Sequence, residues 1–146
     1  MNELCKYCTD DKYLSFGLRN AQENLEKIYR CATTYHTYLE LLCVTAQLYF
    51  RIKDNNIPCS YLEKFDEKRF AQTIFHRAEY MLNGYCYPEY VMYLKQPSQV
   101  LGAFFVRHDG YRIRIDDIQH FSSAYYSLYK NYARLEEIIN ETDASR

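Results

Sequence analysis

The chain of 146 residues is long enough to bury the core of one domain, and nothing in its composition indicates a second domain. Its 18 Lys and Arg against 19 Asp and Glu leave a formal net charge of −1, so we expect no long-range attraction to nucleic acid or to an anionic membrane. The first residues are polar, and no apolar run approaches the roughly 20 residues that span a bilayer, so we expect a cytoplasmic protein without membrane contact.

Two amphipathic helices are predicted in the first third of the chain. Residues 10–32 carry apolar side chains at spacings of three and four, which is typical of one buried helix face. Residues 34–53 repeat this pattern, and Asp54-Asn55-Asn56 followed by Pro58 ends it. Residues 1–9 precede the first stripe and are expected to be flexible.

A third helix has the clearest start signal in the chain. Asp66 is a good N-cap, because its carboxylate can accept from the free amides of the first turn. Phe65 and Phe70 stand at the spacing of a hydrophobic staple, and Asn83-Gly84 predicts the end of the helix. A short helix is expected to follow Pro88.

The period changes after residue 99. Val100–Val106 and Tyr111–Ile115 are predicted to form two strands around a tight turn at Asp109-Gly110. The last helix is predicted from residue 117 to about 140, and residues 142–146 are expected to be flexible. The predicted fold is therefore a single, mainly α-helical domain over residues 1–146, with four antiparallel helices and one small β-hairpin before the last helix.

The six cysteines are expected to be free thiols, because no export signal accompanies them. Cys5 and Cys8 form a C-x2-C pair, which is half of a zinc site. The nearest residues for the other half are Cys31 and His36, at a poor spacing. We therefore expect no metal and no other cofactor, and Cys5 and Cys8 remain the candidate metal ligands.

Asp116, Asp117 and His120 are the candidate catalytic residues. Asp116 and His120 lie four residues apart and share a helix face, and a carboxylate that holds an imidazole is the geometry of a general base. The alternative is structural, because carboxylates at a helix start cap the free amides and favour the positive end of the dipole.

Arg107, Arg112, Arg114 and Tyr93 are the candidate ligand-binding residues. Arginines around a hairpin can hold a phosphate or carboxylate through two parallel hydrogen bonds. The alternative is a set of structural ion pairs with neighbours such as Asp109. The chain also has 17 Tyr, which can be stacking platforms for sugars or bases, or core side chains in place of leucine.

Two segments near the C-terminus resemble a known family. Residues 93–105 (YLKQPSQVLGAFF) and residues 114–124 (RIDDIQHFSSA) are similar to the closing segment of bacterial α/α-toroid proteins related to terpenoid cyclases and prenyltransferase-like repeats. In that pattern a second glycine stands where this chain has Ala103. The resemblance implies that the hairpin closes over the end of a helical barrel and that Asp116 and His120 lie near its mouth.

No complete catalytic, metal or nucleotide-binding motif is present, so we expect a small non-enzymatic interaction or regulatory protein. Its partner would be another protein or a second copy of the chain, because surface tyrosines suit such contacts and a two-fold dimer is the commonest assembly. The alternative is a small enzyme or ligand-binding module of the toroid type that uses Asp116 and His120. A cavity of several hundred Å3 in front of these two residues would favour that alternative.

Overall fold

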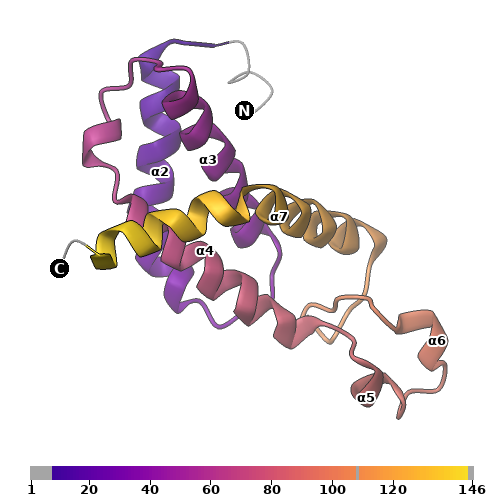
Figure 1. Ribbon diagram of the computed structural model, residues 1–146. Coiled ribbons are helices and arrows are strands. Elements are labelled where there is room, and N and C mark those ends of the chain that lie inside the picture. The colour runs from indigo at the N-terminus through magenta and orange to yellow at the C-terminus, as the bar shows by residue number, and fades with distance from the viewer. Residues whose placement is uncertain (1–7, 108, 145–146) are drawn as a thin grey trace.

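The structure is a computed structural model that describes residues 8–107 and 109–144. The described part is mainly helical, and Figure 1 shows its arrangement. None of the described helices combines the length and the apolar character needed to cross a membrane. The described elements are α2 (Asp11–Arg30), α3 (Thr37–Asp54), η1 (Leu62–Lys64), α4 (Glu67–Met81), η2 (Leu82–Gly84), α5 (Pro88–Val91), α6 (Pro97–Val100) and α7 (Ile115–Ala144).

The sequence patterns of the first three long helices are confirmed. The stripe of α2 is buried as predicted, and its N-cap Asp10 accepts from the amide of Lys12 at 2.9 Å. The N-cap of α4 is Asp66, which accepts from the amide of Arg69 at 2.8 Å. Helix α3 begins at Thr37, three residues later than predicted. Helix α7 begins at Ile115, two residues earlier than predicted.

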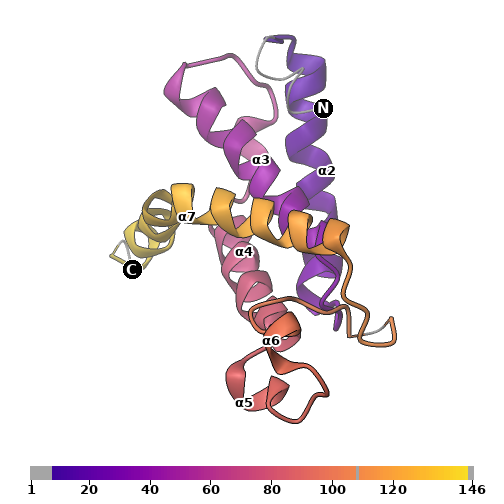
Figure 2. The same cartoon turned by 90° about the vertical axis from the view of Figure 1, so that its right-hand side faces the viewer.

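Helix α7 lies across the other long helices in both views, which corrects the prediction of four antiparallel helices (Figures 1 and 2). Helices α2 and α3 lie side by side, and α7 packs against both α3 and α4. Its Phe121, Ala124 and Leu128 are buried in the main core. A steep crossing lets the apolar stripe of α7 contact α3 and α4 together.

The predicted β-hairpin is wrong, since the described residues contain no strand there. Part of the first predicted strand belongs to α6, and the second contributes one isolated antiparallel bridge between Val106 and Arg112. Ile113 and Ile115 alternate as a strand would require, but they are 38% and 89% exposed. Because no apolar surface covers their side, the alternation gains no burial, and an isolated pair of strands is only marginally stable.

The backbone of the first predicted strand instead pairs with the segment that follows α4. Phe105 donates its amide to the carbonyl of Gly84 at 2.8 Å, and Cys86 donates to Ala103 at 2.8 Å. These bonds form a small lobe with α5 and α6, which has its own core of Cys86, Val91 and Phe105. A Cβ at Gly84 would lie 2.7 Å from the carbonyl oxygen of Phe105, so only glycine allows this approach.

Arg77 on α4 is fully buried and holds the loop between α2 and α3. Its guanidinium donates to the carbonyl oxygens of Cys31 at 2.6 Å and Thr33 at 2.5 Å, and it lies 5.0 Å from the ring centre of Tyr80. Hydrogen bonds and a nearby π face offset the desolvation of this charge. The next residue in the loop, Thr34, donates to the carbonyl of Phe105 and accepts from the amide of Arg107, which ties the lobe to the same loop.

We predict that Arg77→Ala lowers the free energy of unfolding by about 3 kcal/mol, because two carbonyls of the loop lose their donor and a cavity replaces the guanidinium. Arg77→Lys keeps the charge but lacks the planar fork, so its loss should be smaller. Urea denaturation followed by circular dichroism measures both variants. Wild-type stability of Arg77→Ala would contradict the role of this side chain.

The described cysteines, Cys8, Cys31, Cys43, Cys59 and Cys86, are free thiols. Burial raises the pKa of Cys43 to about 12, helped by the neighbouring Glu40 carboxylate, and burial also raises the pKa of Cys86. We predict that iodoacetamide at neutral pH labels Cys8, Cys31 and Cys59 in the native protein, whereas Cys43 and Cys86 react only after denaturation. Peptide mapping by mass spectrometry gives the rates. Equal rates at Cys43 and Cys59 in the native protein would contradict the burial.

Candidate functional site

Two imidazole rings meet where the start of α3 faces the first turns of α7. His36 stands at the N-cap position of α3 and is only 5% exposed. Its Nε2 donates to Oδ1 of Asp117 at 3.0 Å, and Asp117 is also buried. Because an ionised carboxylate only accepts, this bond leaves the lone pair of His36 on Nδ1. Among the described residues, the hydrogen-bond partner of Nδ1 is the hydroxyl of Thr37, at a long 3.5 Å.

The second oxygen of Asp117 faces Arg112. The distance from Arg112 Nε to Asp117 Oδ2 is 3.5 Å, which is an ion pair but too long for a strong hydrogen bond. Arg112 also pairs with Asp109 in the turn before it. The buried Asp117 carboxylate therefore links α3, α7 and the segment that leads into α7.

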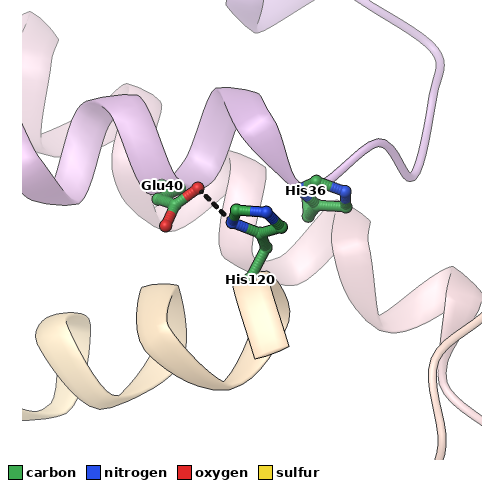
Figure 3. A group of neighbouring side chains, drawn as sticks. All are labelled: His36, Glu40 and His120. Atoms are coloured by element: carbon green, nitrogen blue, oxygen red, sulfur yellow. Dashed lines mark hydrogen bonds and ion pairs between the residues drawn. The ribbon is translucent and has the colours of Figure 1, made fainter. Parts of the chain in front are cut away.

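His120 lies one turn further along α7 and forms the second histidine–carboxylate pair. Its Nδ1 is 2.8 Å from Oε2 of Glu40, which lies one turn after His36 on α3 (Figure 3). The two imidazole rings are stacked, with centres 4.6 Å apart and planes 4° from parallel. His120 is 43% exposed at its side chain, whereas His36 is enclosed. The arrangement is two stacked dyads, and one of them reaches the surface.

Helix periodicity places all four residues. His36 and Glu40 are separated by four positions and Asp117 and His120 by three, so each pair shares one face of its helix. The packing of α3 against α7 then brings the two faces together. Phe121, which follows His120, is buried and meets the His36 ring edge-on at 5.6 Å. Because Phe121 is buried in the apolar core, the packing of the core fixes where along α3 and α7 the two imidazole rings meet.

The sequence-based site residues are only partly brought together. His120 and Asp117 are in the cluster, but their partners are Glu40 and His36, which the sequence did not indicate for this role. Asp116 instead pairs with Arg114 at the surface. The visible signal for the missed residues is the four-residue spacing of His36 and Glu40 at the start of an apolar helix.

The candidate ligand-binding and metal-binding residues are dispersed. Arg112 and Arg114 are engaged by Asp117 and Asp116, and Tyr93 is 83% exposed. Cys5 lies outside the described residues. The carbonyl of Cys8 accepts from the Arg51 guanidinium.

Arg107 lies at a second site, a cavity of about 370 Å3 in the lobe. No carboxylate among the described residues lies within ion-pair distance of its guanidinium, which is exposed. Its backbone is held by Thr34, as described above, so the side chain starts from a fixed point. The walls are mainly aromatic: the ring of Tyr90 stacks on Phe105 with ring centres 5.7 Å apart, and the tilted ring of Tyr111 lies 5.4 Å from the same ring. The cavity, here called the tyrosine pocket, is lined by Tyr85, Tyr87, Tyr90, Tyr111, Phe105 and Arg107, among others.

A smaller cavity of about 160 Å3 lies beside Glu40, between α3 and α7. Its wall includes Ser123, Ser127 and Lys130 of α7. The hydroxyl of Ser127 accepts a hydrogen bond from the side-chain amide of Gln47 at 2.7 Å. Its volume is below that of ordinary small-molecule sites.

No family model matches the chain, and neither a curated protein nor a solved structure matches it. The chemistry of the two sites is therefore the basis for a function.

We predict that Asp117→Asn lowers the free energy of unfolding by about 1–3 kcal/mol, because the buried His36 and Arg112 lose their common anionic partner. The matched control is Asp116→Asn, which changes an exposed carboxylate one residue away and should leave the urea midpoint unchanged. Urea denaturation of both variants at pH 7 measures whether the buried Asp117 carboxylate stabilises the fold. Equal midpoints for the two variants would show that the buried dyad does not contribute.

Proposed function

We propose that the chain is a non-enzymatic binding protein whose recognition site is the tyrosine pocket. The observation that carries this proposal is the combination of aromatic walls with one guanidinium that has no carboxylate partner among the described residues. A cavity with mostly aromatic lining and few polar groups is the usual form of a ligand site. Tyr87, Tyr90 and Tyr111 are 43%, 47% and 56% exposed, so their rings remain accessible to a ligand.

The lining chemistry favours a small ring-bearing anion. Tyrosine rings stack on the faces of bases and on the apolar faces of sugars. This stacking stabilises a complex without a specific set of hydrogen bonds. Arg107 can hold a carboxylate or phosphate through two parallel hydrogen bonds. The amide of Asn83 lies in the same wall and can contact a hydroxyl or carbonyl.

The alternative function, an enzyme or ligand-binding module of the toroid type, would use Asp116 and His120. Neither residue lines the tyrosine pocket or the smaller cavity beside Glu40. Asp116 is engaged by Arg114, and His120 by Glu40. The geometry therefore favours binding without catalysis.

We predict that uridine monophosphate or glucuronate binds the protein more tightly than its neutral counterpart, uridine or glucose. Saturation-transfer NMR identifies the ligands, and titration calorimetry gives their affinities. Tyr90→Ala should weaken binding about 5- to 100-fold, because one stacked ring contributes roughly 1–3 kcal/mol. Arg107→Ala should abolish the preference for the anion and leave the binding of the neutral compound unchanged.

The control is Tyr129→Ala, which removes a 78% exposed tyrosine of α7 that does not line the pocket. It should bind each ligand as the wild type does. Equal losses in Tyr90→Ala and Tyr129→Ala would contradict the pocket as the site, as would a preference for the neutral compounds.

A further inference from the structure

We propose that His36, Glu40 and His120 bind a divalent transition-metal ion, with Zn2+ the best match. One ligand atom from each of these residues lies within 4.8 Å of the others (Figure 3). Two imidazole nitrogens with one carboxylate form a set that zinc accepts, and it leaves a fourth position for water or another ligand. This site is separate from the tyrosine pocket, since none of the three residues lines that pocket.

The buried dyad prepares His36 as a ligand. Asp117 accepts from Nε2, so in the neutral ring Nδ1 carries the lone pair that can bind a metal. A carboxylate that accepts from the outer nitrogen of a metal-bound histidine fixes the tautomer and raises the basicity of the ligand. His36 is 5% exposed, and within residues 8–107 and 109–144 its Nδ1 has the long contact with Thr37 alone, so a buried acceptor is left with little compensation.

The surface dyad supplies the other two ligands. Glu40 and His120 are already 2.8 Å apart, and both reach solvent, with side chains 28% and 43% exposed. An ion can therefore enter from this side without opening the core. Because 43% of its side chain is exposed, the His120 ring can turn about its side-chain bonds once its contact with Glu40 opens.

Binding requires a small rearrangement. Bonds of 2.0–2.1 Å to a tetrahedral ion place its ligand atoms about 3.4 Å apart. The separations of up to 4.8 Å therefore have to shorten by at most roughly 1.4 Å, and the 2.8 Å contact between Glu40 and His120 has to widen slightly. A metal lies in the plane of each imidazole that ligates it, whereas the two rings are now 4° from parallel. His120 must leave the stack and turn towards His36, because His36 is held by Asp117 and by the core.

Titration calorimetry of tag-free protein with ZnCl2 tests the proposal. The Cys5→Ser/Cys8→Ser variant is the parent, since it removes the C-x2-C pair as an alternative zinc site. We expect the parent to bind one Zn2+ per chain. Adding His120→Gln or Glu40→Gln should weaken binding at least tenfold. The control is His76→Gln, which changes a histidine of α4 that stacks on Tyr29 and is not one of the three proposed ligands, and it should leave the affinity unchanged.

Two further readouts separate binding from loss of fold. Zn2+ should raise the melting temperature of the parent and of His76→Gln but not that of His120→Gln, since a ligand of the native state stabilises it by mass action. Co2+ added to the parent should give the visible absorption of a tetrahedral ion. A parent that binds no Zn2+, or a folded His120→Gln protein that binds it as tightly as His76→Gln does, overturns the proposal. A protein that binds Zn2+ but no ligand in the tyrosine pocket contradicts only the proposed function. A protein that binds such a ligand but no Zn2+ contradicts only the metal site.

Discussion

The Arg77 guanidinium fixes the loop between α2 and α3, and the remaining tertiary contacts depend on where that loop lies. Arg77 bonds to the carbonyls of Cys31 and Thr33, which sets the path of the chain just before α3. The neighbouring Thr34 then holds the backbone of Phe105 and Arg107, and His36, two residues on, meets Asp117. One buried cation on α4 therefore positions both the lobe and the start of α7. A charge in that place is stable only because the carbonyls of the loop satisfy it.

Both candidate sites are attached to this loop, but they differ in chemistry. The tyrosine pocket offers accessible rings and a guanidinium with no carboxylate partner in the described part of the chain, which suits an external anion. The stacked dyads offer nitrogen and oxygen lone pairs with little room, which suits a small cation. Each carboxylate in the dyads already has an imidazole or arginine partner, so the cluster gains little from attracting another organic ion.

The long helices were predictable because their stripes repeat over several turns and their caps are explicit, as at Asp66. The hairpin was not predictable. Ile113 and Ile115 alternate as in a strand, but no apolar surface of the described residues packs against them. The true partner of Phe105 is Gly84, and no local pattern in either segment encodes that pairing. The same holds for the site: His120 and Asp117 were recognisable as chemistry-bearing residues, but their partners come from α3. Only the packing of α7 on α3 brings His36 and Glu40 to them.

We also expect the two sites to form at different stages of folding, because their paired residues lie at different separations along the chain. The lobe closes within residues 82–111, whereas the His36–Asp117 and His120–Glu40 contacts join positions 81 and 80 residues apart. Because closing the longer loops costs more entropy, we expect these contacts to form late, after the helices have docked. Interactions that are absent from the folding transition state slow unfolding rather than speed folding. We therefore expect the stacked dyads to slow unfolding, and the pocket to form before them.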